Sequence, residues 1–142
     1  MMTTISQTLS NCPLFDHLED GAKTLLANAS TLSQLADGQT IIEEGQPVDA
    51  LYLIAAGQVH VSTNAMGKDL DLSTLSAGKY FGEVSLMSGK NATADVVSKG
   101  ADLVVIPKET ISELLKNDAI LRKALEGITL ERAKDTLGKV LK

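Results

Sequence analysis

The sequence predicts a mainly β domain of the α+β kind, in which short strands form a sandwich, roll or barrel between two groups of helices. Three observations lead to this expectation: glycines separate short apolar runs in the middle of the chain, apolar residues alternate within those runs, and apolar residues near both ends recur at helical spacing. With 142 residues, the chain is long enough to form one such domain, spanning 1–142, around its own core.

Residues 1–29 are predicted to form N-terminal helices. Their apolar residues lie in a polar background at helical spacing, and they are Leu9, Leu14, Leu18, Leu25, Leu26 and Ala29. Pro13 fits a helix start or a turn better than a helix interior, because it has no backbone N–H to donate.

Residues 30–106 are predicted to form the strands. Six glycines mark the expected turns between them, namely Gly38, Gly45, Gly57, Gly67, Gly78 and Gly82. Within one run Leu51 and Leu53 fall on one face of a strand and Tyr52 and Ile54 on the other, as the two-residue period of a strand requires.

Residues 107–142 are predicted to form C-terminal helices. Pro107 suits a first helical turn. An apolar stripe follows after Asn117 and Asp118, and its members are Leu121, Leu125, Ile128, Ala133, Leu137, Val140 and Leu141. Because this stripe is longer than one small roll would easily cover, the sequence also predicts a homodimer formed through the C-terminal helix.

The net charge of −5 argues against nucleic acid or an anionic membrane as a partner. The start of the chain has no basic segment followed by a long apolar run, so it does not read as a signal peptide, and no apolar stretch is long enough to span a bilayer. The single cysteine, Cys12, fits a reducing compartment. The sequence therefore predicts a cytoplasmic protein.

Catalytic and metal-binding patterns are not evident in the sequence. Two histidines and one cysteine leave no cluster with metal-ligand spacing, and we expect no metal and no cofactor. No nucleophile motif or carboxylate pair stands out. We therefore expect a binding protein and not an enzyme.

The segment 77–97 carries the most specific chemical signal. It contains Phe81-Gly82-Glu83 followed by a short helix-like piece, Val84 to Met87. A glycine before a helical turn lets backbone N–H groups converge on one point, which suits a phosphate. Glu83 would repel a phosphate, but it could accept hydrogen bonds from a sugar hydroxyl beside it.

Several motifs of the chain match one family in register. They include Gly38-x-x-Ile41-x-x-x-Gly45 and Leu72-x-x-Leu75-x-x-Gly78-x-x-Phe81-Gly82-Glu83-x-x-Leu86. The chain thereby resembles the cyclic nucleotide-binding domain family, which includes the catabolite activator proteins and the regulatory subunits of protein kinase A. The resemblance implies an eight-stranded antiparallel β-roll, similar to a jelly roll, with helices at both ends. It also implies that the residues after Gly82 form a phosphate-binding cassette, with Phe81 and Gly82 themselves part of the nucleotide site.

The resemblance also implies roles for individual residues toward a ligand such as cAMP or cGMP. Glu83 would bind the ribose 2′-hydroxyl, the backbone amides of Val84 and Ser85 would meet the cyclic phosphate, and Leu72 would pack near the base.

The chain departs from the family pattern at the end of the cassette. Where the family has an arginine that pairs with the phosphate, this chain has Ala92, although Thr93 keeps the small hydroxyl that often follows. Losing such a charge-assisted contact costs roughly 1.5–3 kcal/mol of binding free energy. Lys90 is a second candidate for the phosphate contact, but a lysine provides a point charge in place of a planar fork.

Two functions remain open at this stage. In the first, the domain is a regulatory sensor that binds a cyclic nucleotide and relays occupancy through its C-terminal helices to a protein partner that the sequence does not identify. In the second, the domain has kept the roll but lost the ligand, and it acts as a protein-interaction or dimerisation module.

Overall fold

The computed structural model describes residues 5–65 and 67–140, with side chains throughout except at residues 65, 129 and 133–140. The helices are α1 (Ile5–Ser10), the 3-10 turn η1 (Pro13–Phe15), α2 (Asp20–Ala29), α3 (Glu83–Ser88), α4 (Lys108–Asn117) and α5 (Ala119–Val140). The strands are β1 (Thr31–Leu35), β2 (Thr40–Ile42), β3 (Ala50–Ala65), β4 (Lys68–Ser76), β5 (Tyr80–Phe81) and β6 (Asp95–Pro107).

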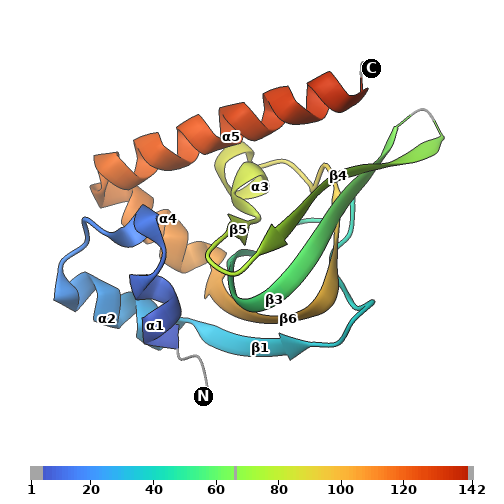
Figure 1. Cartoon of the computed structure of the whole chain (residues 1–142). Coiled ribbons are helices and arrows are strands. Elements are labelled where there is room, and N and C mark those ends of the chain that lie inside the picture. Colours follow the sequence, from blue (N-terminus) through green and yellow to red (C-terminus); the bar gives the residue numbers. More distant parts are fainter. Residues whose placement is uncertain (1–4, 66, 141–142) are drawn as a thin grey trace.

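The strands form one antiparallel sheet that curls into a roll (Figure 1). The order β1-β6-β3-β4 makes the main path, while β2 pairs with β6 and β5 pairs with β3. The N-terminal helices and α4 gather at one end of the roll, and α5 runs past α3 on the outside (Figure 1). The predicted β-roll between two groups of helices is therefore confirmed.

The strand count differs from the resemblance, which implied eight strands, because the described residues form six. The long strands β3 and β6 pair with each other along most of their length, and their register shifts between Ile54 and Ala56 and again between Gly57 and Val59. Such bulges let a strand bend without ending. The bend of the roll is thus made inside these two strands, and Gly57, which the sequence pattern placed in a turn, lies within β3.

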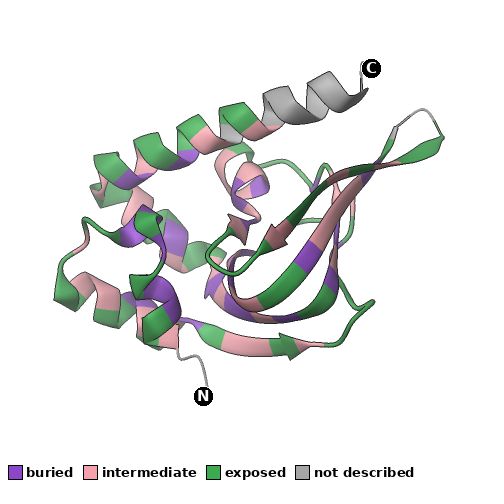
Figure 2. Ribbon diagram, viewed as in Figure 1, coloured by how far each residue is buried: buried purple, intermediate pink, exposed green. Residues whose placement is uncertain are grey.

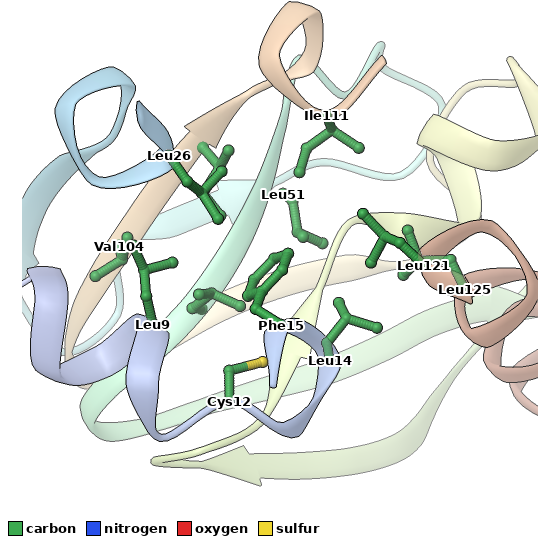
Figure 3. Close-up of a cluster of buried hydrophobic side chains, with 12 residues drawn as sticks. Leu9, Cys12, Leu14, Phe15, Leu26, Leu51, Val104, Ile111, Leu121 and Leu125 are labelled. Carbon is green, nitrogen blue, oxygen red and sulfur yellow. The ribbon is translucent and has the colours of Figure 1, made fainter. Parts of the chain in front are cut away.

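Alternation along β3 divides the core into two clusters. Leu51 and Leu53 point toward the helices, where they join a buried cluster with Phe15, as Figure 3 shows for the labelled members. Ile54 and Val59 point into the roll, where a second buried cluster forms. Buried residues are mixed with half-buried and exposed ones along the curled strands (Figure 2). The predicted separation of the two faces of β3 is confirmed, because each face contributes to a different cluster.

Gly57 occupies a place where a side chain cannot fit. Its φ is 80°, and a Cβ there would lie 1.9 Å from the carbonyl oxygen of Gly100 in β6. Gly57→Ala should destabilise the fold through both backbone strain and overlap, whereas Gly38→Ala, at a φ of 91° with nothing within 4 Å, should cost only the strain. We expect the free energy of unfolding to fall by about 1–3 kcal/mol more for Gly57→Ala than for Gly38→Ala, as measured by chemical denaturation. Equal losses would contradict the close approach of β3 and β6.

The start of α5 is fixed by its cap and by two leucines. The Asp118 side chain accepts a hydrogen bond from the backbone N–H of Leu121 at 2.9 Å, which caps the helix, and its other oxygen lies 2.6 Å from the His17 ring. Leu121 and Leu125 are fully buried against the roll and the N-terminal segment. This anchoring decides which face of α5 turns toward α3.

The anchoring also bears on the predicted dimer seam. Leu121 and Leu125 are already packed within the chain, while Ile128 is half-buried. The side chains of the remaining stripe residues, Ala133, Leu137, Val140 and Leu141, lie outside the described part of the structure.

In the described part of the chain, none of the helices combines the length and apolar character needed to cross a membrane.

Candidate functional site

A cavity of about 280 Å³ opens between the inner face of the roll, α3 and α5. Its walls are largely apolar, with Val61, Leu75 and Val96 among them. The structure brings together in its lining the eight residues that the sequence singled out as one site, namely Leu72, Phe81, Gly82, Glu83, Val84, Ser85, Ala92 and Thr93.

Gly82 sets the direction in which the chain enters the pocket. It joins β5 to α3 with a φ of 98°, and a Cβ there would lie 2.8 Å from the carbonyl oxygen of Ala50. Only glycine adopts this conformation in such close quarters without strain. Glu83 follows as the first residue of α3, and its side chain is completely buried.

Phe81 forms part of the apolar wall next to this turn. It is buried and stacks on Tyr52, with ring centroids 5.0 Å apart and planes inclined by 7°. Tyr52 lies opposite Phe81 in the pairing of β3 with β5. The short β5 strand is thus held in place by both backbone pairing and ring stacking, directly before the Gly82 turn.

Ala92 lies on a loop that is hydrogen-bonded to the segment after β2. Its N–H donates to the carbonyl of Gln46 and its carbonyl accepts from the N–H of Gly45, both at 2.8 Å. The methyl group is buried in the pocket lining. Thr93, the next residue, is exposed, and its carbonyl accepts a hydrogen bond from Thr63 Oγ1 at 3.1 Å.

Lys90 is placed differently from the other candidates. It is exposed and is not part of the pocket lining, and its backbone N–H donates to Ser88 Oγ at 3.2 Å. Its role as a phosphate contact remains a prediction.

Arg132 of α5 is a pocket residue that the sequence pattern did not reveal. Its Nη1 donates to Glu83 Oε1 at 2.5 Å, and its Nη2 donates to the carbonyl oxygen of Tyr80 at 2.7 Å. The guanidinium carbon also lies 5.4 Å from the centroid of the Tyr80 ring. Arg132 therefore links the long C-terminal helix directly to the acid at the start of α3.

A signal for Arg132 was present in the helical spacing. It follows Leu121, Leu125 and Ile128 at steps of four, three and four, so it lies on the same face of α5 as the apolar stripe. A charged residue at such a position turns inward and needs a buried partner of opposite charge. The fully buried Glu83 is that partner.

The electrostatics of the pocket centre on Glu83. Burial raises the pKa of the Glu83 carboxyl above its usual range, and the neighbouring Arg132 charge opposes that rise. Burial and the nearby Glu83 charge raise the pKa of Tyr80 to about 12, so its hydroxyl stays protonated. While Oε1 of Glu83 is bound by Arg132, its Oε2 is buried without a hydrogen-bond partner among the described residues. Such an acceptor has a strong requirement for a donor.

Comparison with known proteins identifies relatives of the chain. The family model described as the cyclic nucleotide-binding domain matches residues 32–118. Human cGMP-dependent protein kinase 2 is 28% identical over 131 residues, which cover 89% of this chain and 17% of the kinase. The chain therefore spans about a sixth of the length of this curated relative.

Two solved structures share the fold. The regulatory domain of Toxoplasma gondii protein kinase A, crystallised with cAMP, superposes with a TM-score of 0.81 at 18% identity, covering 89% of this chain and 49% of that one. The regulatory subunit of a cAMP-independent protein kinase A from Trypanosoma cruzi, bound to guanosine, superposes with a TM-score of 0.79 at 22% identity, covering 93% and 47%.

Proposed function

Because the chain belongs to the cyclic nucleotide-binding domain family, we propose that it is a regulatory sensor that binds a ribose-bearing ligand of the cyclic nucleotide class, with cAMP and cGMP as first probes. The observation that carries this proposal is Glu83, a fully buried carboxylate whose Oε2 is an unpartnered acceptor in a ligand-sized pocket. The ligands of the two similar solved proteins, cAMP and guanosine, both carry a ribose, which supports it.

In the proposed binding mode the sugar sits against α3. Glu83 accepts from a ribose hydroxyl, and the backbone amides of Val84 and Ser85 face the 5′ side of the ligand. The base packs on the apolar wall that includes Leu72. Thr93 and Lys90 lie on the loop after α3 and complete the set of candidate contacts.

The proposed relay runs through Arg132. A ligand hydroxyl that bonds to Glu83 changes the hydrogen bonding of the carboxylate to which Arg132 donates. Arg132 belongs to the long helix α5, so this change reaches that helix. A ligand can shift the position of α5 only by the difference between its affinities for the two arrangements. The Glu83–Arg132 pair supplies that difference, because a ligand hydroxyl on Oε2 and the guanidinium on Oε1 then share one carboxylate.

The relay makes a prediction for Arg132→Gln. Ligand binding should change amide hydrogen exchange along α5 in the parent chain, and this change should shrink at least severalfold in Arg132→Gln even at saturating ligand, because the link to Glu83 is gone. Lys123→Gln, which removes an exposed charge from the same helix, serves as the control and should respond like the parent. An undiminished response in Arg132→Gln would remove Arg132 from the relay.

The second candidate function is a ligand-free interaction module. It is favoured by Ala92 in place of the family arginine and by two exposed apolar side chains of α5, Ile120 and Leu130, which are 63% and 57% exposed. In this case α5 would bind a protein partner or a second copy of the chain without any small ligand.

The same proposal covers the partners of the domain, its lack of catalysis and its location. The domain itself would be noncatalytic and would act through a protein partner, with a homodimer through α5 as one form of that assembly. It would not bind nucleic acid, since its net charge is −5. A cytoplasmic location fits Cys12, which is free and buried.

Calorimetric titration of the chain with cAMP, cGMP and their parent nucleosides tests the proposal. Saturable binding with one site per chain is the expected result. A chain that is folded by circular dichroism and binds none of these ligands would refute the sensor and leave the interaction module.

A further inference from the structure

Among the residues whose side chains the structure describes, the pocket lining offers no unpaired positive charge to an anionic ligand. Glu83 and Arg132 are the two ionisable residues in this described lining, and they are bonded to each other, so their charges cancel. The net charge of −5 adds a field that repels anions further. A phosphate that entered this pocket would lose hydration without gaining a free cation, which is unfavourable.

The unpartnered acceptor in the pocket can pair with a hydroxyl donor but not with a phosphate oxygen. Oε2 of Glu83 is buried and has no donor among the described residues, while Oε1 is occupied by Arg132. A cyclic phosphodiester carries no proton to donate at neutral pH, whereas ribose hydroxyls are donors. Esterification of the 3′ oxygen in a 3′,5′-cyclic nucleotide leaves only the 2′-hydroxyl, but an uncharged nucleoside presents both hydroxyls of a vicinal diol.

The remaining walls also suit an uncharged ligand of small size. The cavity of about 280 Å³ lies at the lower end of the range for ligand pockets. On the loop after α3 the lining side chains are those of Ala92, Thr93 and Ala94, which are small and uncharged. Lys90, on the same loop, is exposed and outside the lining.

We infer that the preferred occupant of this pocket is an uncharged nucleoside, held through its ribose diol by Glu83, and that the cyclic phosphate of the same nucleoside binds more weakly. The inference rests on the proposed function, since it uses the same pocket and the same contact between Glu83 and the sugar. It restricts the proposed ligands to those without a charged phosphate. It also gives Arg132 a second role, which is to neutralise the charge of Glu83 when no phosphate is present.

The test is a calorimetric titration of the full chain at physiological ionic strength with adenosine, guanosine, cAMP and cGMP. We expect at least one nucleoside to bind about tenfold or more tightly than its own cyclic phosphate, as a missing charge-assisted contact to the phosphate would give. The 2′-deoxynucleoside of the same base is the matched ligand control, and its affinity should fall about tenfold or more because one hydroxyl of the diol is gone.

The possible outcomes separate this inference from the proposed function. A cyclic nucleotide that binds as tightly as its nucleoside, or more tightly, overturns the inference but leaves the sensor function standing. In that event Lys90→Ala and Arg132→Gln show whether either side chain reaches the phosphate, because the variant of the responsible residue loses the preference for the cyclic nucleotide. A 2′-deoxynucleoside that binds as well as the nucleoside also overturns the inference, and binding by none of the ligands refutes the proposed function itself.

Discussion

A chain carrying Glu83→Ala is expected to bind nucleosides at least about a hundredfold more weakly than the parent, and cyclic nucleotides, which keep one of the two ribose hydroxyls, at least about tenfold more weakly. Glu83 is fully buried in the pocket, and its Oε2 is the one buried side-chain acceptor without a hydrogen-bond partner among the described residues. Its removal takes away a charged hydrogen-bond acceptor, which contributes roughly 1.5–3 kcal/mol per bond, and a ribose diol makes two such bonds. Calorimetric titration with the tightest ligand of the parent chain measures the loss.

Two further variants make this result interpretable. Glu83→Gln keeps the shape of the side chain and removes its charge, so it reports on affinity even if the alanine variant, which leaves Arg132 without its partner, folds poorly. Glu113→Ala removes an acid from the surface of α4, where its side chain is 71% exposed, and should bind like the parent. Parental affinity in both a folded Glu83→Ala and a folded Glu83→Gln would show that the ligand does not sit against Glu83.

Ala92→Arg is expected to strengthen the binding of cAMP or cGMP by about tenfold to a hundredfold. Ala92 is a buried pocket residue that the sequence resemblance predicts to stand in place of an arginine, and the loop that carries it is fixed by two backbone hydrogen bonds. The new guanidinium would add a planar, permanently charged donor facing the phosphate in a partly desolvated site, which is worth roughly 1.5–3 kcal/mol. The gain should shrink at high salt because part of it is Coulombic.

The matched control places the same charge one residue away. Asn91 is exposed and lies outside the pocket lining, so Asn91→Arg changes the net charge of the chain without adding a cation to the pocket. Ala92→Arg should also favour a cyclic nucleotide over its nucleoside, which reverses the preference inferred for the parent. If Ala92→Arg folds and gains no more than Asn91→Arg, the loop does not face a phosphate and the family arrangement has changed beyond this one position.

Much of the site was predictable because it lies in one short stretch of sequence. Gly82 must be glycine at its φ of 98°, and the residues on either side of it carry a recognisable motif. Glu83 follows at once, so its place in the pocket depends mainly on local geometry. Leu72 and Ala92 were predicted through the family resemblance, and their presence in the same lining depends on the pairing of the strands.

The rest of the site depends on contacts between distant parts of the chain. Arg132 lies 49 residues after Glu83, and no local pattern says that α5 passes over α3. The available signal was a charged residue on the same helix face as Leu121, Leu125 and Ile128. From the sequence alone, that face instead indicates a dimer seam. The structure shows Leu121 and Leu125 buried within the chain, and this packing is what turns Arg132 toward the pocket.

The number of strands was also beyond local sequence reasoning. Gly57 and its neighbours look like a turn, because glycine with polar residues is typical of one. In the structure β3 continues through Gly57 by means of register shifts against β6. A glycine that permits close approach of two strands and a glycine that makes a turn have the same local signature, and only the partner strand distinguishes them.

The central claim is that a ribose-bearing ligand binds in this pocket with its sugar on Glu83. A crystal structure of the chain grown with the tightest ligand of the calorimetric panel tests it most directly. We predict a ribose hydroxyl within hydrogen-bond distance of Glu83 Oε2, with the base against Leu72 and with Arg132 still next to the carboxylate. A ligand bound elsewhere on the chain, or one that lies in the pocket with its sugar turned away from Glu83, would contradict the claim.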